Sequence, residues 1–301
     1  MLSKKIIDQF KVKPGSKVQL RSFDTSWDGD DEFKHLSKDE LKEKAAAVLE
    51  QSRQEMFEAQ RRLFAQDRYS VLAVLQAMDA AGKDGTIKHV LSGINPEGCQ
   101  VVSFKQPSAE ELDHDFLWRV NKALPERGRI GIFNRSHYEE VLVVRVHPAI
   151  LANERLPGSI TGKELWQERY EDINAFERHL ARNGTVIVKF FLQISRKEQK
   201  ERFLARLDDP EKHWKFSPGD VDERAFWDDY MDAFDDAIEA TSTPWGPWYI
   251  IPADKKWVAR ALVARILANT ILSLDLAPAP TSPEQEAENT AARQQLVSEA
   301  A

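Results

Sequence analysis

The fold is decided by the stretch Val71-Leu-Ala-Val-Leu-Gln-Ala-Met-Asp-Ala-Ala-Gly-Lys-Asp-Gly-Thr-Ile-Lys-His89. An apolar run ends at Met78, and small residues with two glycines follow, with Lys83 between the glycines. A basic segment, Ile87-Lys-His-Val-Leu91, comes next. This order predicts a buried strand, a tight turn and a helix. In that arrangement, backbone N–H groups and a helix N-terminus can bind phosphate.

Net charge limits the kinds of partner. The chain of 301 residues carries a formal charge of -7, which argues against a general nucleic-acid binder. A polyanion site must therefore be a local basic pocket. The single cysteine, Cys99, excludes an internal disulfide and suits a reducing compartment. The N-terminus lacks a long apolar segment, and no apolar run approaches membrane-spanning length. We expect a cytoplasmic, soluble protein without a nucleic-acid or membrane partner.

Strands alternate with helices from residue 36 to residue 274. We expect an N-terminal arm with little regular structure (1–35), one large domain (36–274) and a disordered tail rich in Pro, Ala, Glu and Gln (275–301). Predicted strands cover residues 71–78, 100–104, 130–133, 185–193 and 248–251. Predicted helices cover residues 37–65, 87–93, 108–123, 141–146, 161–182, 195–206, 223–240 and 255–274. This alternation predicts an α/β fold with a doubly wound parallel sheet flanked by helices.

Local signals mark helix starts and strand ends. Capping-box patterns, in which a Ser or Thr is followed three residues later by Glu, begin at Ser37, Ser108, Thr161 and Ser195. Ligands of parallel sheets bind at the carboxyl ends of the strands. We therefore expect the residues just after four strands to converge: Asp79, Asn134, Ser195 and Asp254.

The loop after the first strand departs twice from the phosphate-binding pattern G-x-x-x-x-G-K-[ST]. Ala77 replaces the first glycine, and Asp84 replaces the Ser or Thr that binds Mg²⁺. Gly82 and Gly85 still permit close approach of the backbone, and Lys83 supplies a point charge for a bridging phosphate. The strand before the loop and the helix after it favour phosphate binding.

Two carboxylates flank this lysine. Asp79 and Asp84 make chemical sense beside a phosphate if Mg²⁺ joins them, because Mg²⁺ prefers one or two carboxylates plus phosphate oxygens. The alternative is a glycine-rich turn after a buried strand, with Asp84 serving only as a helix cap.

A second constellation follows the third strand. Phosphate-transferring enzymes with such a loop usually place an aspartate here to organise Mg²⁺, whereas this chain has the neutral Asn134. The adjacent Arg135 is suited to stabilise a transferring phosphoryl group. His137 is either a general base or structural, and the structural interpretation is favoured. Glu139 and Glu140 either solvate a helix or bind metal, with solvation favoured for one of them.

A third feature is the basic helix at 195–206. An exposed face laced with Glu–Lys pairs is the plain interpretation. Arg196, however, lies in the first turn, at a strand end that faces the predicted site. Further cations are available to extend a wall for a long anionic substrate. These are Lys88, Arg145, Arg206 and Lys215.

Three motifs together resemble the polyphosphate kinase 2 family over about residues 35–270. They are Met78-Asp-Ala-Ala-Gly-Lys-Asp-Gly-Thr86, Phe133-Asn-Arg-Ser-His-Tyr-Glu139 and Trp214-Lys-Phe-Ser217. The resemblance implies a P-loop kinase core related to thymidylate kinases, with a helical lid at about residues 151–182. It also implies reversible, Mg²⁺-dependent transfer of the terminal phosphate of inorganic polyphosphate to nucleotides. Both departures of the loop from the general pattern are expected in this family.

The motifs and the resemblance assign roles to individual residues. The predicted catalytic residues are Asp79, Lys83, Asp84, Arg135 and Arg196. The predicted metal ligands are Asp79 and Asp84, with Glu139 as a further candidate. Phosphate or nucleotide binding is expected from Ala81, Gly82, Gly85, Thr86, Lys88, Asn134, Tyr138, Arg145, Lys163, Arg178, Arg206 and Lys215. Lys163 and Arg178 are included through the resemblance alone, as polyphosphate contacts of the lid.

One position suggests the acceptor. Family members that mainly convert nucleoside diphosphates look like Phe-Asp-Arg-Ser-Trp-Tyr, whereas residues 133–138 here read Phe-Asn-Arg-Ser-His-Tyr, similar to the subgroup that accepts AMP and ADP. A neutral Asn134 removes a charge that would repel or reposition a phosphate. We expect adenine nucleotides as acceptors, with guanine nucleotides left open, and a homo-oligomer, either a dimer or a tetramer.

Two other functions remain open. A nucleoside monophosphate kinase that uses ATP as donor would share the core, but it should retain the standard glycine-rich loop. A non-catalytic sensor of polyphosphate or nucleotide would be expected to lose the set formed by Asp79, Lys83 and Asp84, and all three are present.

Overall fold

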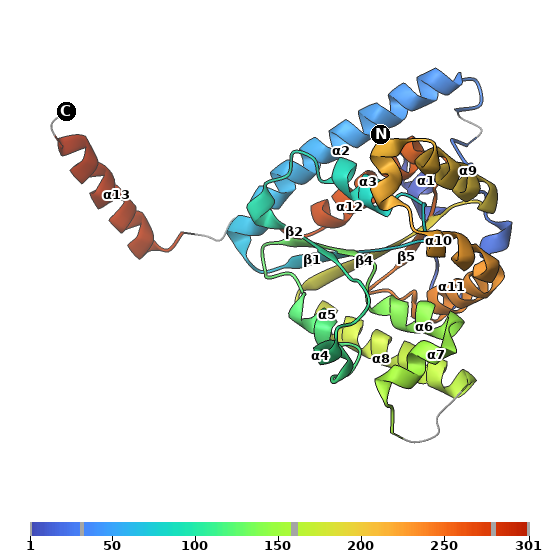
Figure 1. Ribbon diagram of the computed structural model, residues 1–301. Helices are drawn as coiled ribbons and strands as arrows, with labels where there is room; N and C mark the ends of the chain where they lie inside the picture. The colour runs from blue at the N-terminus through green and yellow to red at the C-terminus, as the bar shows by residue number, and fades with distance from the viewer. Residues whose placement is uncertain (1, 31–32, 158–161, 278–280, 300–301) are drawn as a thin grey trace.

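A parallel sheet forms the centre of the molecule (Figure 1). The computed structural model describes residues 2–30, 33–157, 162–277 and 281–299. The five strands are β1 (Ser70–Gln76), β2 (Cys99–Ser103), β3 (Ile130–Asn134), β4 (Thr185–Gln193) and β5 (Trp248–Pro252). Their spatial order is β2-β3-β1-β4-β5, and every neighbouring pair is parallel. The predicted α/β fold with a parallel sheet is confirmed.

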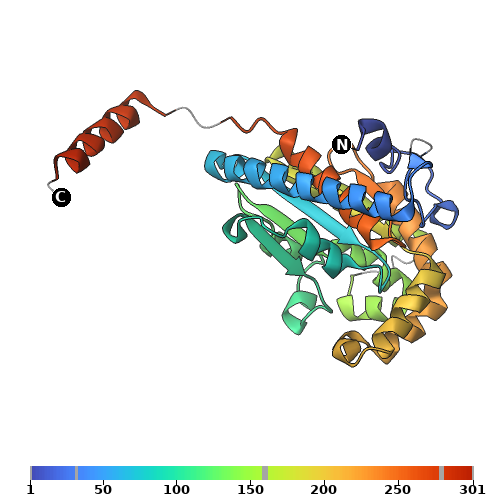
Figure 2. The same ribbon diagram turned by 90° about the horizontal axis from the view of Figure 1, so that it is seen from above.

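Helices cover both faces of this sheet, as parallel strands require. One face carries α2 (Lys38–Gln66), α3 (Lys83–Val90), α9 (Arg196–Leu207) and α12 (Lys256–Leu272) (Figures 1 and 2). The other carries α4 (Ala109–Leu112), α5 (Trp118–Lys122), α6 (Val143–Val146), α7 (Pro148–Leu151), α8 (Lys163–Arg182) and α11 (Trp227–Thr241). The short α10 (Pro218–Asp222) precedes α11. No helix in the described residues is long and apolar enough to cross a membrane.

The strand register brings the site residues together. Leu75 of β1 and Ser103 of β2 are both partners of Asn134 in β3, so these three strands end at the same level. All seven residues of the central strand β1 are buried, which explains its run of Val and Leu. Met56 of α2 and Leu262 of α12 close the core above the sheet. Burial of such a side chain stabilises the fold by about 1.5–3 kcal/mol.

The N-terminal arm differs from the extended segment that we expected. It forms α1 (Lys4–Asp8) and buries Ile6, Ile7 and Phe10 in the main core. The carbonyl oxygen of Phe10 accepts a hydrogen bond of 2.9 Å from the amide of Ile250 in β5. The arm therefore covers the β5 edge of the sheet. Its apolar side chains pack in the core, and its backbone pairs with N–H and C=O groups that an edge strand would leave unpaired.

The predicted disordered tail contains a helix. α13 (Pro283–Ser298) has no buried residue and projects away from the domain (Figures 1 and 2). Ser282 caps this helix and Pro283 occupies its first turn. The composition predicted disorder, but Ala, Glu, Gln and Arg are strong helix formers, so local propensity accounts for a helix without packing.

Other boundaries also differ. The helix expected over 108–123 is divided into α4 and α5, although the capping boxes at Ser37 and Ser108 are complete. Ser195 accepts from the amide of Glu198, while the carboxylate of Glu198 pairs with Arg202 instead of closing the box. Thr161 lies outside the described residues. Most of the segment predicted as a lid is α8, whose apolar face is buried in the core.

Candidate active site

A cavity of about 1060 Å³ lies beyond the carboxyl ends of β1, β2 and β3. Eleven of the predicted site residues line it, and they come from three separate parts of the chain. These are Asp79, Ala81, Gly82, Lys83, Asp84, Gly85, Thr86, Asn134, Arg135, Glu139 and Arg206. The sheet edge thus brings the loop after β1 and the turn after β3 to one place, as the doubly wound topology predicts.

The loop after β1 has the shape of a phosphate-binding loop. Ala80 and Gly82 both have left-handed backbone conformations, with φ of 61° and 104°. Gly82 is the N-cap of α3, and the first turn of this helix lines the cavity. The amides of a first turn have no partners within the helix and favour anions. Lys83 closes the loop by donating a 2.9 Å hydrogen bond to the carbonyl oxygen of Ala77.

Lys83 is held in an environment that favours an incoming anion. Burial lowers the pKa of its ammonium, and the nearby Arg135 lowers it further. The carboxylates of Asp79, Glu139 and Asp84 oppose this shift without cancelling it. A phosphate that enters beside Lys83 would supply the missing negative charge and stabilise the protonated lysine.

Asn134 links the turn after β3 to α3. Its side-chain amide donates to Asp84 Oδ1 at 2.8 Å and to Ser103 Oγ at 3.4 Å. Asn134 Oδ1 is buried and accepts no hydrogen bond from the described residues. A carbonyl oxygen without a hydrogen bond and a nearby carboxylate are the kind of oxygen ligands that Mg²⁺ prefers. The ion usually keeps waters or phosphate oxygens as its other ligands.

The protein alone does not supply a full metal cage. Within the described parts of the chain, no three Asp, Glu, His or Cys side chains converge to hold an ion. Glu139, the further candidate ligand, lies 3.6 Å from the guanidinium of Arg135 instead. The residues therefore fit a Mg²⁺ ion that takes one or two protein oxygens, from Asp84, Asp79 or Asn134, and completes its shell with phosphate.

Arg135 is oriented by two carboxylates. Its Nη2 donates to Asp79 Oδ1 at 2.9 Å, and its Nη1 lies 3.6 Å from Glu139 Oε2. Burial lowers the pKa of Arg135, but Glu139 and Asp79 raise it, and the net pKa is above the ordinary value. Arg135 also has a left-handed φ of 63°, a conformation that costs energy for a residue with a Cβ and often occurs at functional sites.

Arg202 of α9 contacts the loop after β1, and the sequence analysis assigned it no role. Its guanidinium donates to the carbonyl oxygens of Ala80 at 3.0 Å and Ala81 at 2.8 Å. It also donates to the carbonyl oxygens of Ala253 and Asp254, past the end of β5. The signal was present, because Arg202 lies one turn before Arg206 on the same helix.

More cations line the cavity than the sequence indicated. The additional ones are Lys105, Arg119, Arg202, Lys212, Lys256 and Arg260. A Cβ placed on Gly85 would lie 3.6 Å from Arg260 Nη2, so this guanidinium adjoins the phosphate loop. Burial, followed by the nearby Arg202, lowers the pKa of both Lys256 and Arg260. No local motif marked these two residues, because α12 looks like a packing helix.

The cavity also has an apolar part. Its apolar lining comes from Phe104, Pro107, Leu112, Val143, Val144 and Ile150. Here Arg119 pairs with Glu140 at 3.3 Å, and both side chains are buried. Burial, with Glu154 nearby, raises the pKa of Glu140 to about 7. The expectation that Glu139 or Glu140 solvates a helix was wrong, because neither side chain is exposed.

Five of the predicted cations lie outside this cavity, Arg178 among them. Arg196 is exposed and donates to the carbonyl oxygen of Arg224 at 3.2 Å. Arg145 pairs with Asp236 and with the hydroxyl of Tyr170. Lys88 and Lys163 are exposed at positions that do not line the cavity. The direction of a side chain on a helix depends on its position around the helix axis and on its rotamer, and its charge does not reveal that direction.

Two further predicted residues lie away from this cavity, and a third lies outside the description. Arg178 lies over the ring of Trp245, 5.3 Å from its centre, and does not line the cavity. Tyr138 is fully buried and does not reach the cavity. The side chain of Lys215 is outside the described residues. His137 is buried, as its structural interpretation requires. Ser195 and Asp254 do meet, through a 2.7 Å hydrogen bond, but away from the cavity.

The parallel sheet, the phosphate-type loop after its central strand and the helix that follows define a P-loop kinase-like protein. The sequence pattern of the polyphosphate kinase 2 family matches residues 36–276, and the chain belongs to this family.

Relatives agree with this membership over nearly the whole chain. The chain is 52% identical over 290 residues to the ADP-polyphosphate phosphotransferase of Rhodopseudomonas palustris, covering 96% of this chain and 98% of that one. It is 44% identical over 266 residues to the AMP/ADP-polyphosphate phosphotransferase of Meiothermus ruber, covering 88% and 93%. The crystal structure of polyphosphate kinase 2 from Arthrobacter aurescens TC1 superposes with a TM-score of 0.80 at 40% identity, covering 95% and 96% of the two chains.

Proposed function

We propose that this protein transfers the terminal phosphate of inorganic polyphosphate to AMP and ADP, forming ADP and ATP reversibly. The observation that carries the proposal is the convergence of Lys83, Asp84, Asn134 and Arg135 in one cavity whose walls hold further cations. Family membership and the names of the relatives support polyphosphate as the phosphate donor.

The lining of the cavity suits two substrates. The guanidinium and ammonium groups on α9, α12 and the turn that holds Lys212 match the evenly charged chain of polyphosphate. The apolar side chains around Phe104 and Val143 suit a nucleoside, because ligand pockets combine apolar walls with a few polar groups. A cavity of about 1060 Å³ has room for both.

In the proposed mechanism, a phosphate oxygen of the nucleotide attacks the terminal phosphorus of polyphosphate in line. The new P–O bond forms as the bond to the rest of the chain breaks, and the shortened polyphosphate leaves with the electron pair. Lys83 and the first-turn amides of α3 hold the reacting phosphates. Arg135, oriented by Asp79 and Glu139, neutralises the charge of the moving phosphoryl group.

Mg²⁺ is proposed as the cofactor; when bound, it neutralises phosphate charge and fixes the geometry of the phosphate oxygens. Asp84 and Asp79 would hold it, with the buried Oδ1 of Asn134 as an additional oxygen. The hydrogen bond from Asn134 to Asp84 orients the carboxylate.

The names of the relatives leave the acceptor to experiment. The Rhodopseudomonas palustris protein is named for ADP, and the Meiothermus ruber protein for both AMP and ADP. Asn134 supports the broader specificity, because its neutral side chain removes a charge that would repel or reposition the phosphate of an acceptor. We also propose that the protein acts in the cytoplasm as a homo-oligomer, since Phe57 and Phe64 expose a large apolar area on α2. Light scattering of the purified protein measures that assembly.

One assay distinguishes the functions. The purified protein is given AMP and Mg²⁺ with polyphosphate, with ATP, or with neither, and the nucleotides are separated by chromatography. We expect ADP and then ATP only when polyphosphate is present. ADP formed from AMP and ATP alone would support a nucleoside monophosphate kinase. Tight binding of polyphosphate without any product would support a sensor.

A further inference from the structure

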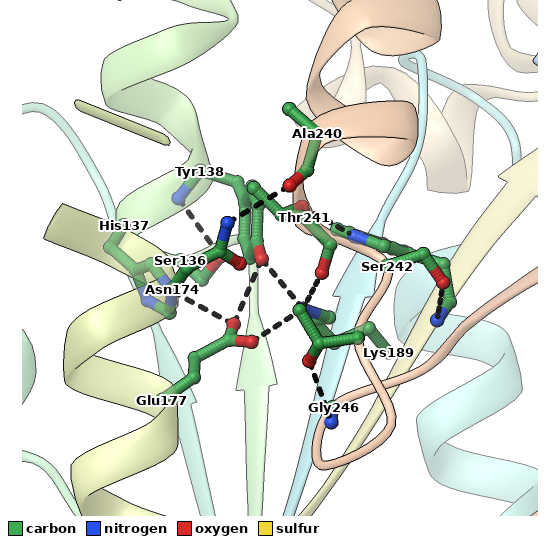
Figure 3. Close-up of polar contacts among 12 residues, drawn as sticks. Ser136, His137, Tyr138, Asn174, Glu177, Lys189, Ala240, Thr241, Ser242 and Gly246 are labelled. Carbon is green, nitrogen blue, oxygen red and sulfur yellow. Dashed lines mark hydrogen bonds and ion pairs between the residues drawn. The ribbon is translucent and has the colours of Figure 1, made fainter. Parts of the chain in front are cut away.

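Tyr138, Glu177 and Lys189 form a fully buried ionic network (Figure 3). Lys189 lies in the middle of β4 and Glu177 lies on α8. The distance from Lys189 Nζ to Glu177 Oε2 is 2.5 Å. The hydroxyl of Tyr138 donates to Glu177 Oε1 at 2.8 Å and accepts from Lys189 Nζ at 2.8 Å. Lys189 also donates to the carbonyl oxygen of Thr241, at the end of α11. None of these side chains lines the cavity.

Stability alone gives a weak reason for this network. Removing two charges from water costs several kcal/mol per ion, and well-packed apolar residues often replace such a pair without loss. Burial lowers the pKa of Lys189, and Glu177 raises it in return without cancelling the shift. The network does fix geometry, because its short, directional bonds join β4, α8, α11 and the turn after β3 at one point.

That turn connects the network to the active site. Tyr138 and His137 stand between Arg135 and Glu139, in the 3-10 helix His137–Val141. His137 Nε2 is 3.5 Å from Glu177 Oε1, so His137 and Tyr138 contact the same carboxylate. Ser136, the residue directly after Arg135, is also anchored, because its Oγ accepts a 3.1 Å hydrogen bond from Gln76 at the end of β1. Arg135 has an unfavourable positive φ, and the bonded residues 136–138 that follow it hold its backbone in this conformation.

We propose that Tyr138, Glu177 and Lys189 are positioning residues that hold Arg135 in its reactive orientation. The inference rests on the proposed function, since it assumes that Arg135 acts on the transferring phosphoryl group. Tyr138 thus belongs to the machinery of the reaction through Arg135, although it does not touch substrate.

Tyr138→Phe tests the proposal, because it removes one hydroxyl and keeps the ring. We expect kcat to fall about tenfold, since a small misplacement of a catalytic group has effects of this order or larger. The KM for polyphosphate should stay within about twofold, as expected for an interaction made mainly in the transition state. The matched control is Ser70→Ala, which removes a buried hydroxyl bonded to Thr185 Oγ1 at the opposite end of the sheet. It should lower the melting temperature similarly and leave kcat unchanged.

A double-mutant cycle shows whether the effect passes through Arg135. Arg135→Lys keeps the charge but loses the planar fork, so a measurable rate should remain. In that background, Tyr138→Phe should change kcat less than about twofold, because the group that it positions is already displaced. Equal effects in both backgrounds would overturn the proposal, as would a normal kcat for Tyr138→Phe in the otherwise unchanged protein.

A third variant separates position from stability. The triple substitution Tyr138→Phe, Glu177→Leu and Lys189→Met replaces the network by apolar groups, and its melting temperature should be maintained or raised. We expect kcat to fall at least as far as in Tyr138→Phe. A stable triple variant with normal kcat would make the network purely structural. If the unchanged protein does not use polyphosphate at all, the proposed function fails instead, and normal turnover of Arg135→Lys would refute the role of Arg135.

Discussion

The side-chain amide of Asn134 donates a 2.8 Å hydrogen bond to the carboxylate of Asp84. Asn134 ends β3, and Asp84 lies in the first turn of α3, so the bond joins the two motifs on which the site depends. Because Asn134 is neutral, one carboxylate is oriented here without a second negative charge beside it. The remaining oxygen of Asn134 is buried and accepts no hydrogen bond from the part of the chain that the structure describes.

Asn134→Asp should narrow the choice of acceptor. A second carboxylate 2.8 Å from Asp84 would repel it and draw Mg²⁺ and the phosphates toward a new position. We expect the ratio of kcat/KM for AMP to that for ADP to fall by about tenfold, equivalent to about 1.4 kcal/mol. Steady-state kinetics with each acceptor measure this ratio. Asn134→Ser, which shortens the side chain without adding charge, is the control and should lower both rates without changing the ratio.

Lys83→Ala should abolish turnover while the protein stays folded. The ammonium contributes one hydrogen bond to Ala77 within the loop, whereas its charge serves the phosphates. We expect kcat to fall by at least about a hundredfold, in the range seen when a group that stabilises a transition state is removed. Circular dichroism and a melting curve check the fold. Lys197→Ala, on an exposed side chain of α9, should behave as the unchanged protein does. Turnover of Lys83→Ala near the normal rate would refute the role of this lysine.

Arg202→Met should weaken both the loop and the whole domain. Four carbonyl oxygens lose their guanidinium donor, two of them in the phosphate loop and two after β5. We expect the free energy of unfolding to fall by about 3 kcal/mol, a cost set by buried groups left without partners. The KM for polyphosphate should rise because the loop is no longer held. Denaturant titration and kinetics measure the two effects. Lys200→Met, exposed on the same helix, should change neither.

Glu140 should make stability depend on pH in a defined direction. Burial, followed by repulsion from Glu154, raises the pKa of Glu140 from 4.5 to about 7. Between these values the folded protein keeps a proton that the unfolded chain has released. Stability therefore falls as pH rises through this window, by up to about 3 kcal/mol.

Glu140→Gln tests that dependence, because it keeps an acceptor for Arg119 and cannot ionise. The loss of stability between pH 5 and pH 8 should shrink, and the variant should be more stable than the unchanged protein at pH 8. Denaturant titrations at both pH values give the comparison. Glu126→Gln, on an exposed side chain, should leave the pH profile as it is. An unchanged profile for Glu140→Gln would contradict the assigned shift.

Side chains in local motifs were predictable, and isolated cations were not. Lys83, Asp84, Asn134 and Arg135 follow strand ends, where topology forces them toward one edge of the sheet. Arg145 was chosen for its charge and Arg178 through the family resemblance, and in the fold both contact other partners. The opposite error occurred with Arg202, Lys256 and Arg260, which were not assigned from the sequence although they line the cavity.

The sequence by itself determined the order of strands and helices, the phosphate loop and the neutral Asn134, because these depend on periodicity and on neighbouring residues. Only the tertiary structure decided which cations share the cavity, that the arm belongs to the core, and that Tyr138 bonds to Glu177 and Lys189. Such contacts join residues far apart in the chain, and their geometry arises from the packing of helices on the sheet. The stretch from Val71 to His89 thus predicts a phosphate-binding loop, while the fold determines which groups surround it.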